Sequence, residues 1–132
     1  GRLFKGCLDR NIPILTECRA EHLIIENETV AGVRGEGPDV SFEITARGGV
    51  VLATGGFEWN PELVRAFLRG PMSSPVSVPT NEGDGLKMTM RIGAALGNMR
   101  EAWWMPAVEI PGDRGDGRPA GKRGRYSLYR DG

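Results

Sequence analysis

Four consecutive apolar residues, Val50-Val51-Leu52-Ala53, are followed directly by the small residues Thr54-Gly55-Gly56. A run that is apolar at every position predicts a strand covered on both faces, as in a parallel sheet. In open α/β sheets ligands bind at the carboxyl ends of such strands, and small residues there let a ligand approach the backbone. We therefore expect an α/β fold with a ligand site at Thr54–Gly56. The apolar run is far shorter than the ~20 residues that span a bilayer.

The residues before this run predict a β-meander. Leu23-Ile24-Ile25 and Val30–Val33 flank the polar pair Asn27-Glu28, and this pattern is typical of a β-hairpin. From Val40 to Ala46 apolar and polar residues alternate strictly. The alternation predicts a further strand with one solvated face.

Helices are expected on both sides of these strands. Apolar spacing predicts one helix over 3–8, followed by a short strand over 12–15. Asn60-Pro61 is a favourable helix start, because Asn caps well and Pro suits the first helical position. That helix should end at Gly70, and a second helix is predicted over 85–96.

Charge and composition exclude several function classes. The chain carries 17 Lys+Arg against 17 Asp+Glu, whereas nucleic-acid recognition needs surplus cations on one face. One His and two Cys without metal-site spacing give no reason to expect a metal. The phosphate-cradling Gly-x-x-x-x-Gly-Lys-Ser/Thr and the hydrolase Gly-x-Ser-x-Gly are both missing. No signal peptide or membrane span is visible, so we expect a soluble, cytoplasmic protein.

The end of the sequence has a different composition. Residues 112–132 (GDRGDGRPAGKRGRYSLYRDG) are rich in Gly and charged residues, and Leu128 is the one aliphatic residue beyond Ala. Such a segment buries too little apolar surface to offset the entropy lost on ordering. We predict a flexible tail over 112–132, preceded by an extended segment over 103–110.

A second glycine-rich stretch, Asn81-Glu82-Gly83-Asp84-Gly85, opens the helix predicted over 85–96. Glycines at a helix N-terminus offer backbone donors and close approach to a flat or anionic ligand. Asp84 itself would repel phosphate, so it is better suited to accept hydrogen bonds from a hydroxyl or a backbone N–H. Both stretches also have a plain structural alternative, since glycines serve tight turns and Asp is an ordinary cap.

In this order and spacing the stretches resemble a flavoprotein family. The motifs are VVLATGGF-x-x-N, then T-N-E-G-D-G-L, then GAALGNM followed by aromatic residues. They resemble fumarate reductase and succinate dehydrogenase flavoprotein subunits and the 3-ketosteroid Δ1-dehydrogenases. The upstream PILTECRAEHLIIENETVAGVRGEG is similar to the β-meander that precedes the Ala-Thr-Gly-Gly strand in that family. The Glu101–Pro106 stretch is closer to the ketosteroid-dehydrogenase-like members, because the Phe-His-Pro element of fumarate reductases is absent.

The resemblance implies a partial FAD-binding domain of glutathione-reductase type, with FAD as the cofactor. It implies a substrate-capping region that begins at Trp103, Trp104 and Met105, near the isoalloxazine. The backbone of Ala20 falls where the family commonly contacts the adenine. The full set of implied FAD contacts is Ala20, Ala53, Thr54, Gly55, Gly56, Asn81, Gly83, Asp84 and Gly85.

We therefore predict a partial FAD-binding domain over 1–100, the start of the capping region over 101–111 and the tail over 112–132. The dinucleotide fingerprint Gly-x-Gly-x-x-Gly is not in this sequence, and no catalytic acid or base can be named. We expect one part of a longer FAD-dependent oxidoreductase that moves a hydride between flavin and a carbonyl-activated C–C bond. Its expected partners are a steroid-like or dicarboxylate small molecule, and either the rest of the flavoprotein or further copies of itself. A non-catalytic structural or binding module is the alternative.

Overall fold

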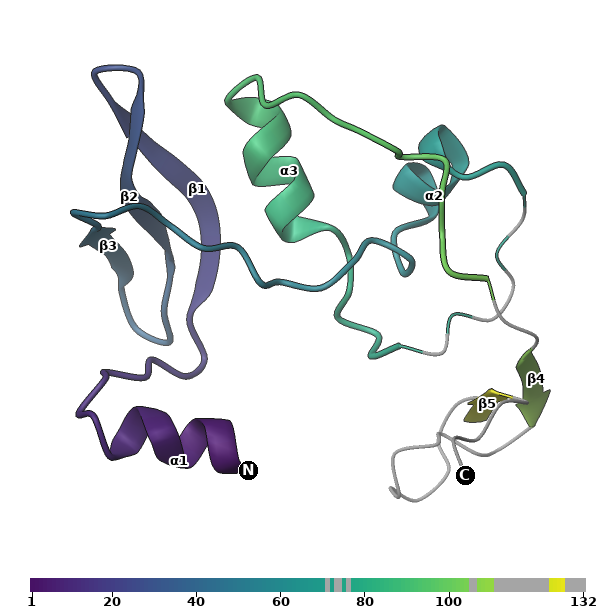
Figure 1. Cartoon of the computed structure of the whole chain (residues 1–132), viewed down its shortest axis with the longest axis horizontal. Coiled ribbons are helices and arrows are strands. Elements are labelled where there is room, and N and C mark those ends of the chain that lie inside the picture. The colour runs from purple at the N-terminus through teal and green to yellow at the C-terminus, as the bar shows by residue number, and fades with distance from the viewer. Residues whose placement is uncertain (71, 73–74, 76, 105–106, 111–123, 128–132) are drawn as a thin grey trace. The chain divides into compact units, whose positions relative to one another are not determined.

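The computed structural model describes residues 1–70, 72, 75, 77–104, 107–110 and 124–127 (Figure 1). Two compact units make up the chain, Gly1–Val51 and Leu52–Gly132. Both helices and antiparallel strands occur among the described residues, so the α/β class is confirmed in its coarse form. None of the described helices has the length and apolar character that crossing a bilayer requires.

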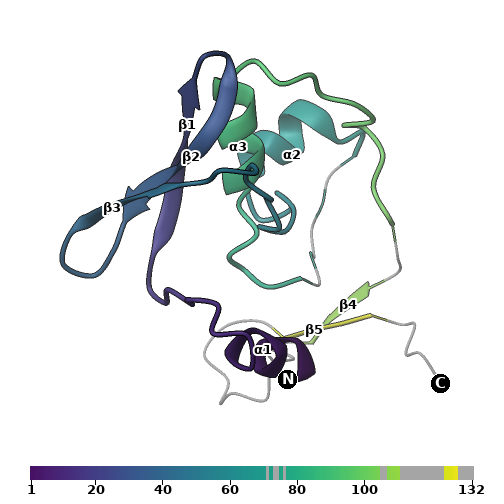
Figure 2. The same ribbon diagram turned by 60° about the vertical axis from the view of Figure 1, so that its left-hand side comes forward.

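The first unit holds helix α1 (Arg2–Leu8) and a three-stranded antiparallel sheet. Its strands are β1 (Arg19–Glu26), β2 (Thr29–Glu36) and β3 (Ser41–Thr45). They lie side by side in chain order, as Figure 2 shows. The predicted helix over 3–8 and the predicted β-meander are both confirmed.

The turn between β1 and β2 is formed by Asn27 and Glu28, whose φ angles are 48° and 62°. Two successive positive φ angles define a type I′ turn, whose twist matches that of the flanking strands. Asn adopts this region readily, whereas Glu adopts it at a cost. The cost at Glu28 is offset by the pairing that begins immediately beyond the turn, where Glu26 lies opposite Thr29.

Two predicted strands are not formed. Residues 12–15 are irregular, and the run Val50–Ala53, predicted as a strand of a parallel sheet, is extended but belongs to no sheet. A strand is held by hydrogen bonds to neighbours, and no described strand pairs with either segment. The Val51 side chain is 90 % exposed, so the prediction of a strand covered on both faces is wrong for the described residues.

The second unit contains helices α2 (Pro61–Phe67) and α3 (Asp84–Arg91). The predicted cap of α2 is present, because Asn60 Oδ1 accepts hydrogen bonds from the N–H groups of Glu62 and Leu63, each over 3.1 Å. The helix ends at Phe67, before the predicted stop at Gly70.

Helix α3 is shorter than predicted, because a glycine ends it early. Gly93 has φ 77°, and its N–H donates to the Met90 carbonyl over 3.1 Å. The next N–H, of Ala94, donates to the Thr89 carbonyl over 3.1 Å. This pair of hydrogen bonds is the Schellman arrangement that ends many helices, so the prediction of a helix running to 96 is wrong.

The packing around these helices is light. Met88 on α3 is the buried hydrophobic residue of the described chain, with 2 % of its surface exposed. Phe57 and Phe67 add an edge-to-face ring contact, with centroids 5.9 Å apart. This geometry is favourable for an aromatic pair, and it joins the start of the second unit to the end of α2.

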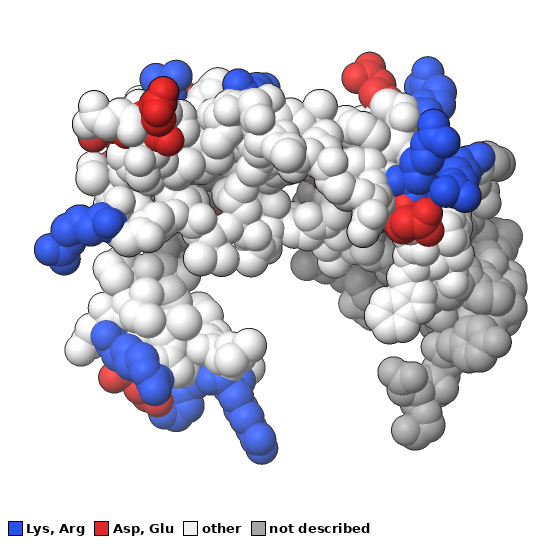
Figure 3. All heavy atoms as spheres, turned by 45° about the horizontal axis from the view of Figure 1, so that its top comes forward, with Lys and Arg blue, Asp and Glu red and all other residues white. Residues whose placement is uncertain are grey.

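The last described elements are β4 (Ala107–Ile110) and β5 (Gly124–Ser127), which pair antiparallel. Most of the predicted tail over 112–132 lies outside the described residues, and the part that is described forms β5. The predicted division at residues 100 and 111 stays a prediction. On the face seen in Figure 3, acidic and basic side chains lie in small groups among uncharged residues.

Candidate functional site

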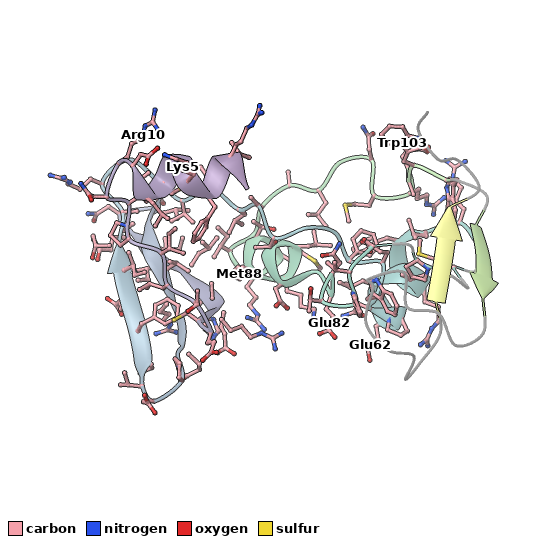
Figure 4. The ribbon with its side chains drawn as sticks, turned by 90° about the horizontal axis from the view of Figure 1, so that it is seen from below. Lys5, Arg10, Glu62, Glu82, Met88 and Trp103 are labelled. Atoms are coloured by element: carbon pink, nitrogen blue, oxygen red, sulfur yellow. The ribbon has the colours of Figure 1, made fainter. Side chains whose placement is uncertain are left out.

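The two glycine-rich stretches lie against each other within the second unit. We call Ala53–Gly56 the strand-end corner and Asn81–Gly85 the helix-start corner. The Gly83 N–H donates to the Gly56 carbonyl over 3.0 Å. Figure 4 shows Glu82 of the helix-start corner, and Met88 on the helix that follows it. The two stretches are therefore neighbours in space.

Residues just after the strand-end corner bind the helix-start corner through three further hydrogen bonds. The Trp59 N–H donates to the Asn81 carbonyl over 3.1 Å. The Asn60 Nδ2 donates to the Glu82 carbonyl over 3.2 Å, and the Asn81 Nδ2 donates to Glu58 Oε1 over 2.9 Å. These bonds tie two chain segments more than twenty residues apart into one structure.

Glycine is required at positions 83 and 85 because the corners pack closely. A Cβ on Gly85 would collide with the Thr54 hydroxyl. A Cβ on Gly83 would lie 2.6 Å from Leu63 Cδ1 and 2.8 Å from Phe57 Cβ. Gly83 also has φ 79°, a conformation that favours glycine. Both residues are buried, so their first role is to let the two corners meet.

Glycine is also required at position 55. Its φ is 78°, and a Cβ there would collide with the Asn81 side-chain amide. At Gly56 the Cβ position is taken by the carboxylate of Glu58. The amide of Asn81 and the carboxylate of Glu58 therefore lie directly against the strand-end corner.

The strand-end corner is also open to solvent. Ala53, Thr54, Gly55 and Gly56 are all exposed. Within the described part of the chain, the N–H groups of Thr54, Gly55 and Gly56 donate to no backbone carbonyl. Exposed backbone donors beside glycines can hydrogen-bond a ligand that approaches the main chain closely.

The charges at the site are mainly acidic. Burial raises the pKa of Glu58, but hydrogen bonds from the Asn81 and Ser77 side chains and from its own backbone outweigh burial and leave that pKa below its ordinary value. Glu58 is therefore a carboxylate at neutral pH. Asp84 lies 3.8 Å from the ammonium of Lys87. The described ranges contain no group of three or more His, Cys, Asp or Glu side chains able to hold a metal ion.

Ala20 lies in the first unit, apart from both corners in the chain. It is in β1 opposite Gly35, and a Cβ on Gly35 would lie 2.9 Å from Ala20 Cα. The pairing register shifts between Ala20 and His22, which marks a β-bulge or irregularity. Bulges re-aim the backbone and occur frequently beside functional sites.

The aromatic residues predicted to face the substrate are described in part. Trp103, labelled in Figure 4, is 94 % exposed, and Trp104 is 52 % exposed. Met105 lies outside the described residues. An ion pair links Glu101, just before these aromatic residues, to Arg69, just after α2. Its N–O distance is 3.2 Å.

Residues 1–129 match the FAD binding domain family. The chain belongs to this family. The match includes both corners of the FAD-binding domain, and it supports FAD as the cofactor.

Two curated relatives with similar sequences are both dehydrogenases of oxo compounds. The 4-oxocyclohexanecarboxylate 2-dehydrogenase of Sinomonas cyclohexanicum is 43% identical over 133 residues, which cover 94% of this chain and 22% of that protein. A 3-oxosteroid 1-dehydrogenase of Mycobacterium tuberculosis is 36% identical over 119 residues, which cover 85% of this chain and 21% of that protein.

A solved structure agrees with these sequence relatives. The 3-ketosteroid delta1-dehydrogenase from Sterolibacterium denitrificans, in complex with 1,4-androstadiene-3,17-dione, matches with a TM-score of 0.77 and 34% identity. The match covers 84% of this chain and 21% of that one. The chain thus spans about a fifth of the length of these relatives. The predicted resemblance to ketosteroid-dehydrogenase-like flavoproteins is confirmed.

Sequence reasoning missed the polar residues that hold the strand-end corner and the helix-start corner together. Glu58 binds Asn81, and the indole Nε1 of Trp59 donates to the carbonyl and to the hydroxyl of Ser77, each over 3.1 Å. The one available signal was the Phe57-Glu58-Trp59 order, in which a carboxylate stands between two aromatic residues. Nothing in the local pattern identifies the partners, because they lie some twenty residues further along the chain.

Proposed function

We propose that this chain forms part of an FAD-dependent oxidoreductase that exchanges a hydride with a C–C bond next to a carbonyl group. The family match over residues 1–129 carries the proposal. The reaction class is supported by the names of the two relatives, which are dehydrogenases of a 4-oxocyclohexanecarboxylate and of 3-oxosteroids. Both names describe ring compounds with an oxo group, so we propose a cyclic ketone as the substrate in preference to an open-chain dicarboxylate.

The strand-end corner is the proposed contact surface for FAD, through Ala53, Thr54, Gly55 and Gly56. Its exposed backbone donors fit such a contact. The carboxylate of Glu58 lies against Gly56. It would therefore repel a phosphate group bound at the strand-end corner, because both groups are negatively charged. We therefore assign a hydroxyl-bearing or ring portion of FAD to this corner, and we assign its pyrophosphate elsewhere.

The remaining implied contacts have different roles in this proposal. Gly83 and Gly85 are buried, so they support the site by letting the corners meet. Asn81 and Asp84 supply side-chain acceptors for FAD. Ala20, which is half-buried in β1 beside a register shift, is the proposed adenine contact in an arrangement of glutathione-reductase type.

Trp103, Trp104 and Met105 form the substrate side of the proposed site. The high exposure of Trp103 supports this role, since an exposed indole is available to cover an apolar ring. Bound FAD supplies the hydride acceptor or donor. The protein binds and orients the flavin and the substrate, and it excludes water from them. The acid or base of the reaction is not assigned to a residue. The cytoplasmic location stays a prediction.

The test is to express the chain within its complete natural reading frame and purify it. We expect a yellow protein with flavin absorbance, which reduces an artificial electron acceptor when given a cyclic 3-oxo compound and not when given succinate. The Gly85→Val variant should lose flavin, whereas Gly97→Val, at a position with nothing within 4 Å of a Cβ, should keep it. A colourless protein that takes up no added FAD would contradict the proposal.

The non-catalytic alternative has one observation in its favour. Each glycine of the helix-start corner is explained by contacts within the protein alone. On that alternative, Gly85→Val would only lower stability, because neither the parent nor the variant would bind flavin. Flavin retention by the parent protein separates the two functions.

A further inference from the structure

Glu58 lies at the point where the two corners meet. Its side chain is half-buried. Oε1 accepts a hydrogen bond of 2.9 Å from Asn81 Nδ2, and Oε2 lies against Gly56. The carboxylate therefore touches the helix-start corner with one oxygen and the strand-end corner with the other.

The carboxylate decides which way the Asn81 amide faces. An ionised carboxylate only accepts hydrogen bonds, so it selects the NH₂ end of a neighbouring amide. The opposite end of the amide then faces Gly55. From the Cβ position of Gly55, the oxygen Oδ1 is the nearest atom of Asn81, while Nδ2 is 3.1 Å away.

We propose that Glu58 is a positioning residue of the FAD site, because it orients the Asn81 amide so that its oxygen is the acceptor presented at Gly55. This inference rests on the proposed function, because FAD is the ligand toward which the amide oxygen is oriented. Oδ1 would accept a hydrogen bond from a hydroxyl or N–H of FAD. An amide turned the other way would present a donor at Gly55, and that contact would be lost.

The backbone of Asn81 is held without Glu58. Its N–H donates to the Val78 carbonyl over 3.1 Å, and its carbonyl accepts from the Trp59 N–H over 3.1 Å. Removing the carboxylate therefore releases the side chain of Asn81 and the hydrogen bond from Ser77, while the backbone hydrogen bonds of Asn81 remain. A positioning role predicts a loss of FAD affinity with little change in thermal stability, whereas a purely structural role predicts that both fall together.

The experiment measures the FAD dissociation constant and the melting temperature of the protein expressed from its complete natural reading frame. Glu58→Gln keeps the size of the side chain, but it can turn either its oxygen or its NH₂ to Asn81. We expect the FAD Kd to rise about tenfold, the order expected for one lost hydrogen bond. Glu58→Asp, which keeps a carboxylate, should restore part of the affinity. Glu62→Gln on α2 is the matched control and should leave the Kd unchanged.

A double-mutant cycle separates positioning from general damage. Asn81→Ala removes the acceptor, so we expect a loss similar to that of Glu58→Gln. In the Asn81→Ala background, Glu58→Gln should have no further effect. Additive losses, an unchanged Kd in Glu58→Gln, or a Kd that rises only in step with a lower melting temperature would each overturn the inference. If Glu58→Gln does not fold, an unchanged Kd in Asn81→Ala overturns it instead.

The outcomes also separate this inference from the proposed function. A parent protein that binds no FAD overturns both. A parent protein that binds FAD, together with variants that bind it equally well, overturns the role of Glu58 and leaves the flavoprotein function standing.

Discussion

The hydroxyl of Thr54 fills the space in which a Cβ on Gly85 would stand. One residue lies at the end of an extended apolar run and the other lies in the first turn of α3. Their contact makes the two glycine-rich stretches a single structural unit, because no larger residue at position 85 leaves room for Thr54.

The first prediction concerns this contact. Gly85→Ala should lower the free energy of unfolding by about 1–3 kcal/mol, since overpacking forces Thr54 or the helix to move. Urea unfolding followed by circular dichroism measures the change. Gly97→Ala is the control, because nothing lies within 4 Å of its Cβ position. An equal effect in the two variants would contradict the packing argument.

The second prediction separates backbone strain from collision. Gly55 and Gly93 have nearly the same φ, 78° and 77°, but a Cβ meets the Asn81 amide at Gly55 and nothing within 4 Å at Gly93. Gly93→Ala should cost about 1–2 kcal/mol, from the left-handed conformation alone. Gly55→Ala should cost measurably more in the same denaturant titration. Equal losses would mean that Asn81 moves aside freely.

The third prediction concerns the two functions of Asn60, which caps α2 and donates to the Glu82 carbonyl. Asn60→Ala removes both interactions and should cost about 1–2 kcal/mol. Asn60→Asp keeps the capping oxygen and loses the amide donor. The stability that this variant loses therefore measures the contribution of the hydrogen bond to the Glu82 carbonyl. If Asn60→Asp is as stable as the parent in thermal melts, the bond to Glu82 contributes nothing measurable.

The fourth prediction is a pH dependence. The pKa of Glu58 is lowered in the folded protein, because hydrogen bonds from Asn81, Ser77 and its own backbone outweigh the effect of burial. A lowered folded pKa stabilises the protein above the unfolded pKa, and this contribution is lost as the pH falls through the folded value. The small stability difference expected between the parent and Glu58→Gln should therefore shrink below about pH 4.3, the ordinary glutamate pKa, as the carboxylate becomes protonated. A difference that is constant from pH 7 to the acid limit would refute this.

The fifth prediction concerns Val51, which is 90 % exposed and lies in the segment Val50–Ala53, which pairs with no described strand. Exposed apolar residues on unpaired extended segments favour association between chains. In sedimentation velocity, Val51→Ser should reduce the self-association of the 132-residue chain. Its stability should change by less than about 0.5 kcal/mol. Val78→Ser, at an exposed loop position, is the control and should leave the association unchanged.

Local patterns predicted the elements that depend on local chemistry. The Asn60 side chain caps α2 because Asn, Pro and Glu follow one another at its start. The β1–β2 hairpin formed where two apolar runs flank Asn27-Glu28, even though neither turn residue is glycine. Both features are decided within a few residues of the chain.

Elements that depend on distant partners were not predictable in this way. Val50–Ala53 has the composition of a covered strand, but composition does not supply the neighbouring strands that would cover it. The end of α3 was missed because the apolar spacing continues past Gly93, where the backbone turns left-handed. The Glu58–Asn81 hydrogen bond joins residues 23 positions apart, and no periodicity in the sequence relates them.

The boundary between the two compact units falls between Val51 and Leu52, immediately ahead of the strand-end corner. The segment from Thr54 to Gly85, with the hydrogen bonds described between the corners, is thus contained in one continuous stretch of the amino-acid sequence. A recombination event at that boundary would carry the complete arrangement into a new protein, and it would be inherited as a whole.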